Sequence, residues 1–136
     1  MYWVSVSDGF KPVFMADSPA SWHKGRCPTV TVEVLESKWV GSARTIYVGK
    51  ASGSLRERVG ALVRFGVGGR QTSIGHWGGR YIWQIADSEK LEIFWEVDPK
   101  DPECNERRRV VNFNATYGAI PFANHSFPAG CRDHRG

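Results

Sequence analysis

The chain alternates apolar and polar residues, as a β-strand does, at residues 29–36 and again at residues 91–97. In the first stretch, three valines at every second position fall on one face, which predicts a half-buried strand. A short apolar run at residues 44–48 follows a turn-like Val-Gly-Ser-Ala segment, so residues 29–48 are predicted to form a hairpin. Residues 13–15 are a candidate edge strand. The pattern therefore predicts three main strands.

Helical spacing appears in two later segments. Ser54 is a suitable N-cap for a helix that reaches about residue 65. Asp101 and Pro102 are typical of a helix start, and Gly118 is typical of a helix end, which predicts a second helix over residues 102–117. Residues 76–84 are rich in aromatic residues and are a candidate for a short helix. The predicted fold is α/β of the α+β kind: a small three-stranded, mainly antiparallel sheet flanked by helices.

The length of 136 residues fits one domain with a sizeable core. We expect an irregular N-terminal extension at residues 1–27, a domain at residues 28–125 and a flexible tail at residues 126–136. The three cysteines form no Cys-x-x-Cys pair, which supports neither a disulfide framework nor a zinc site. No segment has the length of a membrane span and no signal pattern begins the chain, so a cytoplasmic location is expected.

The net charge of +4 permits a polyanionic partner but does not require one. Two charged residues fall on faces that helical spacing turns inward. Arg58 lies at the edge of the apolar stripe of the first helix. Glu106 lies in line with Val110 and Phe113 of the last helix. A carboxylate in that position needs a cation, hydrogen-bond donors or a metal ion, and a structural ion pair with Arg58 is the simplest alternative.

Further polar groups gather where the second predicted strand ends. Tyr47, Gly49 and Lys50 close that strand just before the helix that carries Arg58. A phenol, an ammonium and a guanidinium are the groups expected around a phosphodiester. Each has an ordinary alternative, since strand tyrosines usually pack in cores and loop lysines are usually solvated. His76, in its aromatic run, is more often a packing or surface residue.

Together these residues resemble the GIY-YIG nuclease superfamily, over roughly residues 28–124. Tyr-Val-Gly-Lys-Ala at residues 47–51 resembles the second signature motif, and Ser-Leu-Arg-Glu-Arg-Val at residues 54–59 resembles the helix with the family's arginine. Glu106 resembles the metal-binding glutamate, and Asn124 resembles the asparagine that follows it. The run at residues 76–84 is similar to that of small stand-alone bacterial members.

The resemblance implies metal-dependent hydrolysis of DNA phosphodiester bonds. Glu106 would hold Mg²⁺ or Mn²⁺, Arg58 would bind the phosphate, and Tyr47 would orient or deprotonate the attacking water. Asn124 would brace the site. The implied catalytic residues are Tyr47, Lys50, Arg58, His76, Glu106 and Asn124. The expected contacts to DNA are made by Lys50, Arg56, Arg58, Arg70 and Arg80.

One position departs from the family pattern. The first signature tyrosine is expected on the strand at residues 29–36, and Thr31 occupies its place. Lys50 would then substitute for it as a base or water-positioning group. The alternatives are a DNA-binding module that has lost cleavage, and a small-molecule or protein-binding domain with a structural Arg58–Glu106 pair. Whether the protein is a monomer or a homodimer is not determined by the sequence.

Overall fold

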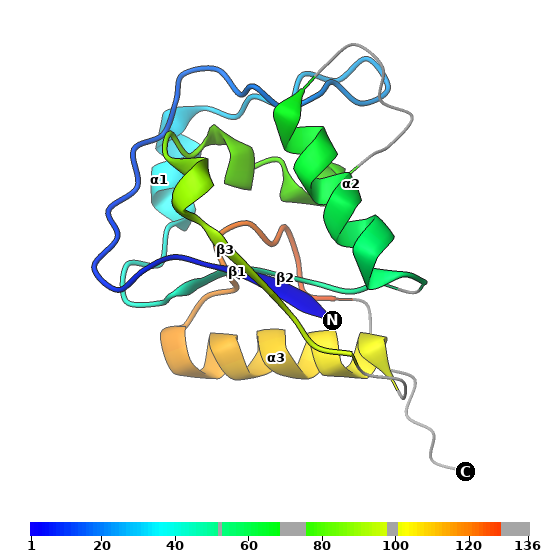
Figure 1. Cartoon of the computed structure of the whole chain (residues 1–136). Helices are drawn as coiled ribbons and strands as arrows, with labels where there is room; N and C mark the ends of the chain where they lie inside the picture. The colour runs from blue at the N-terminus through cyan, green and yellow to red at the C-terminus, as the bar shows by residue number, and fades with distance from the viewer. Residues whose placement is uncertain (52, 69–75, 98–100, 129–136) are drawn as a thin grey trace.

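A three-stranded antiparallel sheet forms the centre of the fold (Figure 1). The computed structural model describes residues 1–51, 53–68, 76–97 and 101–128. Strand β1 (Tyr2–Ser5) is the middle strand and pairs with β2 (Thr45–Gly49) on one side and β3 (Glu92–Trp95) on the other. The expected α+β class and three-stranded antiparallel sheet are confirmed, but the middle strand comes from the N-terminus.

The predicted strand at residues 29–36, and with it the hairpin at residues 29–48, was wrong. Residues Val32–Lys38 form helix α1, and Thr31 is its N-cap rather than a residue of the sheet. The alternation of valines stops at Leu35, which is fully buried in the core, whereas Val34 is largely exposed. Burial of Leu35 on one helical face therefore outweighs the strand preference of the valines.

The N-terminal region was expected to be irregular, and for residues 2–5 this was also wrong. The run Tyr-Trp-Val-Ser supplies the strand that hydrogen-bonds with both neighbours. The candidate edge strand at residues 13–15 is reduced to a single antiparallel bridge between Phe14 and Ile85. About forty residues separate β1 from its partner β2, which is why local sequence patterns do not indicate the pairing.

Both long helices were predicted correctly. Helix α2 spans Leu55–Val67, and the Ser54 side chain accepts a hydrogen bond from the Glu57 amide at 3.2 Å. Helix α3 spans Pro102–Tyr117 and ends at Gly118, which has the left-handed conformation that favours glycine. Between α2 and β3, the described residues 76–91 form three short 3₁₀ helices: η1 (Trp77–Gly79), η2 (Ile82–Gln84) and η3 (Ser88–Lys90).

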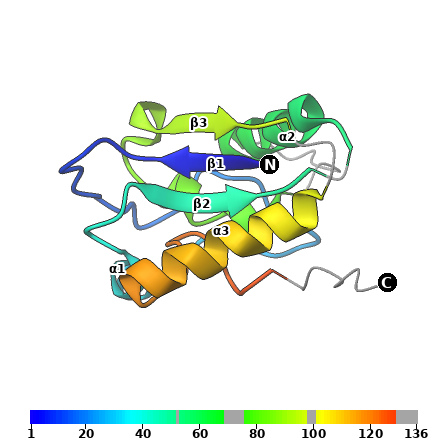
Figure 2. The same ribbon diagram turned by 90° about the horizontal axis from the view of Figure 1, so that it is seen from below.

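The helices lie in two layers around the sheet (Figures 1 and 2). Helix α3 covers one face, where Val48 and Val110 form a small core with Met1. Helices α1 and α2 and the 3₁₀ segments cover the other face, where the main core includes Leu35 and Leu62. The side chains of β1 and β2 that point into this second layer belong to the candidate site.

Two further observations bear on the sequence expectations. Within the described ranges, no helix combines the length and apolar character needed to cross a membrane. Cys27 is exposed and free, whereas Cys104 is disulfide-bonded, so the sequence argument against a disulfide was wrong for Cys104.

Candidate functional site

Two tyrosines lie side by side on the α2 face of the sheet. Tyr2 pairs with Gly49 and Val4 pairs with Tyr47, so the antiparallel register turns both phenols to the same face. Their ring centroids are 6.0 Å apart, and both side chains are buried. Gly49 makes this arrangement possible, because a Cβ there would lie 2.5 Å from the Tyr2 ring. The glycine of the Tyr-Val-Gly motif therefore leaves the space that the Tyr2 ring occupies.

His76 completes an aromatic group of three with the tyrosines. Its Nε2 is hydrogen-bonded to the Tyr2 hydroxyl, and its ring meets the rings of Tyr2 and Tyr47 edge-on. The start of η1 holds the histidine in place, where Gly79 allows close approach of the imidazole. Burial, with a smaller contribution from the positive charge of Arg58, lowers the pKa of His76 to about 4. The imidazole is therefore neutral at physiological pH.

The low pKa of His76 predicts a loss of stability in mild acid. Below about pH 6.5 the unfolded chain binds a proton at this histidine. In the folded protein the histidine binds that proton only below about pH 4. The free energy of unfolding should fall across this window by up to about 1.4 kcal/mol per pH unit. Urea denaturation at a series of pH values measures this, with His76→Gln as the comparison. Parallel curves for the two proteins would contradict the assignment.

Arg58 directs its charge at this aromatic group. It is half-buried on α2, as its position at the edge of the apolar stripe predicted. Burial raises the pKa of both tyrosines, and the charge of Arg58 acts in the opposite direction on each. The same charge reaches His76. A guanidinium at this point favours any negative charge that develops on the phenols or on a bound phosphate.

Glu106 lies near the start of α3, which covers the opposite face of the sheet from α2. Its charge raises the pKa of Tyr47, which places the carboxylate within electrostatic reach of the phenol. Burial raises the pKa of Glu106 itself, and the charge of Lys50 partly offsets this. Its Oε2 atom is buried without a hydrogen-bond partner. Such an oxygen is costly unless a cation or a donor binds it.

This carboxylate fits a hard divalent cation bound mainly through water. Mg²⁺ is often held by one or two carboxylates while it keeps several waters, and the buried, unpaired Oε2 would provide one such ligand. Among the residues that the structure describes, no group of three or more acidic, histidine or cysteine side chains forms a denser metal site. The donor is a carboxylate oxygen, which is the type of ligand that Mg²⁺ and Mn²⁺ prefer.

Lys50 lies between the sheet and the first turn of α3. Its Nζ forms an ion pair with Glu103 at 3.2 Å, and its charge also acts on Glu106 one turn further along the helix. From the sequence, Lys50 was expected to lie beside Tyr47 and to act as a base or to position the attacking water. The structure places its ammonium with the two glutamates, at about one-third exposure of the side chain.

Asn124 holds the end of β2 in place. Its Oδ1 accepts a hydrogen bond from the amide of Val48, and its Nδ2 donates to the carbonyl of Val48, both at 3.0 Å. The neighbouring Ala123 amide donates to the carbonyl of Ile46. Asn124 thus takes the place of a further strand beside Tyr47, which is the bracing role expected of it, and its amide is occupied.

Removal of the Asn124 amide should destabilise the protein. In Asn124→Ala both backbone groups of Val48 lose a buried partner, which should cost about 2–4 kcal/mol of unfolding free energy. Chemical denaturation measures this loss, and Asn112→Ala, at an exposed position on α3, is the matched control. A loss no larger than that of the control would contradict this role.

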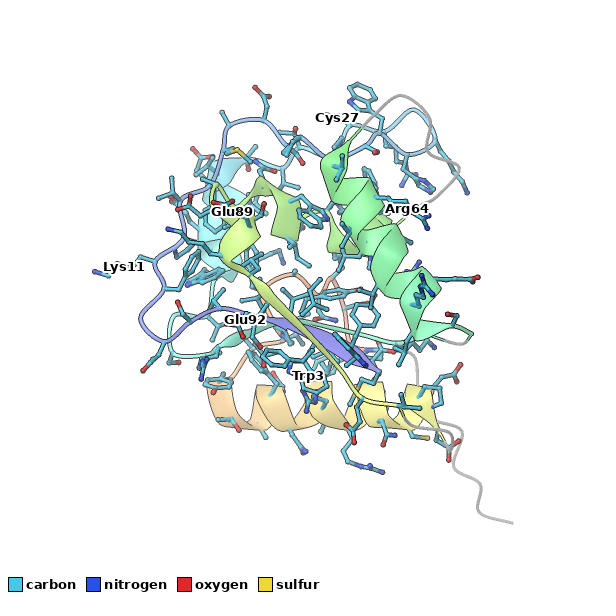
Figure 3. The ribbon with its side chains drawn as sticks, in the orientation of Figure 1. Trp3, Lys11, Cys27, Arg64, Glu89 and Glu92 are labelled. Atoms are coloured by element: carbon cyan, nitrogen blue, oxygen red, sulfur yellow. The ribbon has the colours of Figure 1, made fainter. Side chains whose placement is uncertain are left out.

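The basic residues expected to contact DNA have different positions. Arg56 is exposed at the start of α2. Arg80 is half-buried, with its guanidinium 4.5 Å from the centre of the Trp77 ring and 5.2 Å from that of Tyr81. Arg70 lies outside the described residues. On the α3 face, Trp3 lies under the sheet (Figure 3) with the Arg109 guanidinium stacked on its ring.

The important residue that sequence reasoning missed is Tyr2. A run of aromatic and β-branched residues at 2–6 was the available signal for a strand, but the nearby glycine and prolines favoured an irregular segment. Comparisons with protein-family models, with curated proteins and with solved structures found no match.

Proposed function

We propose that the chain is a metal-dependent DNA endonuclease of the GIY-YIG type, which hydrolyses phosphodiester bonds. The observation that carries the proposal is the convergence of two buried phenols, a guanidinium and a carboxylate with an open buried oxygen. These groups come from β1, β2, α2 and α3, so the fold assembles them from distant parts of the chain. Tyr2 supports the resemblance further, because it supplies the second phenol that the sequence seemed to lack at Thr31.

Each residue then has a distinct task. Arg58 would bind the non-bridging oxygens of the scissile phosphate, for which its planar fork is well suited. Tyr47 would orient the attacking water through its hydroxyl, which stays protonated at neutral pH because burial raises the pKa of this phenol, with Arg58 and the interaction with Tyr2 acting in the opposite direction. Glu106 would hold Mg²⁺ or Mn²⁺, which supplies stabilisation of developing negative charge when bound.

Tyr2 and His76 would position the reacting phenol. A neutral imidazole hydrogen-bonds to the Tyr2 hydroxyl and fixes the orientation of that ring beside Tyr47. Because the pKa of His76 is about 4, the imidazole is a weak base at neutral pH. We therefore assign His76 as a positioning residue rather than as the group that takes the proton from water. Asn124 has a similar positioning role through β2.

DNA would approach across the basic residues around this site. Arg56 lies two residues before Arg58, and Lys50 lies at the end of β2. Contacts of this kind to phosphate are independent of sequence and weaken with salt. Their charge agrees with the net charge of +4.

A DNA-binding module without cleavage is the second candidate function. It is suggested by Thr31, which provides no phenol where the first signature tyrosine is expected. Tyr2, which lies beside Tyr47, provides a second phenol and so weakens this reason for expecting an inactive protein. Plasmid nicking in Mg²⁺ and in EDTA, with an electrophoretic shift assay at several salt concentrations, separates the two. The nuclease predicts nicking only in Mg²⁺ or Mn²⁺. Salt-dependent binding without nicking in either metal would favour the inactive module, and absence of both would exclude a nucleic-acid function.

The cytoplasmic location expected from the sequence stays a prediction.

A further inference from the structure

An open apolar pocket lies beside the proposed nuclease site, between the first turns of α2 and the end of β3. Its volume is about 530 Å³, and it is lined by Leu55, Arg56, Val59, Gly60, Trp95 and Val97. Trp95 and Val97 are 65% and 78% exposed. The pocket has the volume of a small-molecule site.

The pocket neighbours the site across the β1–β3 strand pair. Trp95 on β3 is the direct register partner of Tyr2 on β1, so both side chains project from the same face. Adjacent strands lie roughly 5 Å apart, and this is the step between the two positions. On the helix above, Arg56 lines the pocket and Arg58 faces the tyrosines. A nucleotide whose phosphate is held at Arg58 can therefore place its base in the pocket.

The lining selects among possible occupants by its charge and shape. Among the described residues of the lining, Arg56 is the charged one, and its charge disfavours a cationic ligand. A second copy of the chain in a two-fold contact would bring this patch against itself, with Arg56 close to its own equivalent. A nucleobase offers a flat π-face to the Trp95 ring, and its nucleotide offers a phosphate to Arg56.

We propose that this pocket binds the base of a nucleotide adjacent to the scissile phosphate, with the base stacked on Trp95. The inference rests on the proposed nuclease function and narrows its substrate. A base stacked inside a duplex cannot enter a pocket of this kind, so the substrate carries an unpaired or extruded nucleotide at this position. Single strands, flaps and gapped duplexes meet this requirement.

The test compares two single-stranded DNA probes of equal charge in EDTA, which prevents cleavage. One is a fluorescent oligodeoxynucleotide with all its bases, and the other has tetrahydrofuran abasic sites at its central positions. Trp95→Ala should bind the first probe about tenfold more weakly than wild type, because that is a typical loss for one stacked base. Its affinity for the abasic probe should change less than about twofold, since the phosphate contacts remain.

A second variant and a control make the result specific. Gly60→Leu fills the pocket on a helix that tolerates it, because a Cβ there meets only the end of the Arg64 side chain at 3.9 Å. It should reproduce the effect of Trp95→Ala. Trp22→Ala is the control, because Trp22 is another exposed tryptophan. It lies far from the pocket, since the amide of the neighbouring Ser21 donates to the carbonyl of Phe65 at the other end of α2. Trp22→Ala should bind both probes as wild type does.

Equal affinities of wild type and Trp95→Ala for the first probe would overturn the proposal, as would equal losses on both probes. Self-association of wild type that Trp95→Ala abolishes would also overturn it, because the pocket would then be an interface between copies. These outcomes are separate from the fate of the nuclease assignment. If wild type nicks plasmid but Trp95→Ala binds the first probe as tightly as wild type does, base binding in the pocket is rejected and the nuclease function is not. If Trp95→Ala loses affinity for the first probe alone but wild type does not nick plasmid, the nuclease function is rejected and base binding is not.

Discussion

Replacement of Glu106 by glutamine is expected to reduce DNA nicking by roughly three orders of magnitude, since bound metal supplies several kcal/mol of transition-state stabilisation. Glutamine keeps the size of the side chain but removes the charge that a divalent cation requires. This expectation depends on the Oε2 atom of Glu106, which is buried and has no hydrogen-bond partner among the described residues. Initial rates of supercoiled plasmid relaxation in Mg²⁺ measure the effect.

Glu103→Gln is the matched control for this variant. Glu103 lies one turn earlier on α3, is more exposed, and pairs with Lys50. Its replacement should change the nicking rate by less than about fivefold, because surface ion pairs contribute little. Equal losses of nicking rate in the two variants would show that the overall negative charge at the start of α3, rather than Glu106 itself, supports cleavage.

The stability of Glu106→Gln separates loss of metal from loss of fold. Burial raises the pKa of Glu106 above its unfolded value, so the ionised carboxylate destabilises the metal-free fold at neutral pH. This cost disappears as the pH falls through the raised pKa. We expect Glu106→Gln to be more stable than wild type at pH 7 in EDTA, and the difference to shrink towards pH 4. Mg²⁺ should raise the Tm of wild type alone.

Replacement of Tyr47 by phenylalanine is the second large effect that we expect. The ring and its packing remain, but the hydroxyl that would orient the attacking water is lost. The nicking rate should fall by roughly 10²-fold, which is the order of loss that a misplaced reacting group causes. Tyr2→Phe should lower the rate less, because Tyr2 would act through Tyr47 and His76.

The pattern among the tyrosine variants tests this division of roles. Tyr117→Phe, at the exposed end of α3, should leave the rate unchanged. Salt-dependent DNA binding should persist in all three variants, since the phosphate contacts are retained. A nicking rate of Tyr47→Phe within about twofold of wild type would show that this phenol does not orient the attacking water.

Local signals made much of the fold predictable. The Ser54 cap, the Asp101–Pro102 start and the Gly118 end each satisfy backbone groups within a few residues, and both helices have the expected positions. The apolar run before Gly49 and the alternation after Leu91 likewise became β2 and β3. These features depend on near neighbours in the chain.

The errors arose where distant residues decide the structure. The valines after Pro28 have a strand pattern, but burial of Leu35 against the main core makes a helix there. Strand β1 is placed by hydrogen bonds to segments about 40 and 90 residues away, which no local pattern indicates.

The same distinction applies to the site. Helical spacing correctly turned Arg58 and Glu106 inward, and both act electrostatically on Tyr47. The register between β1 and β2 brings Tyr2 to that point, and sequence spacing assigned its place to Thr31 instead. The partner of Lys50 was missed for a similar reason, since Glu103 meets it only through the docking of α3.

The most direct test of the proposed function is the nicking of supercoiled plasmid by wild type and Glu106→Gln, purified in parallel and assayed in Mg²⁺ and in EDTA. We predict open-circular product from wild type in Mg²⁺ alone, and none above background from Glu106→Gln under either condition. Equal nicking by the two proteins, or nicking by wild type that persists in EDTA, would contradict the proposal that Glu106 holds a catalytic metal.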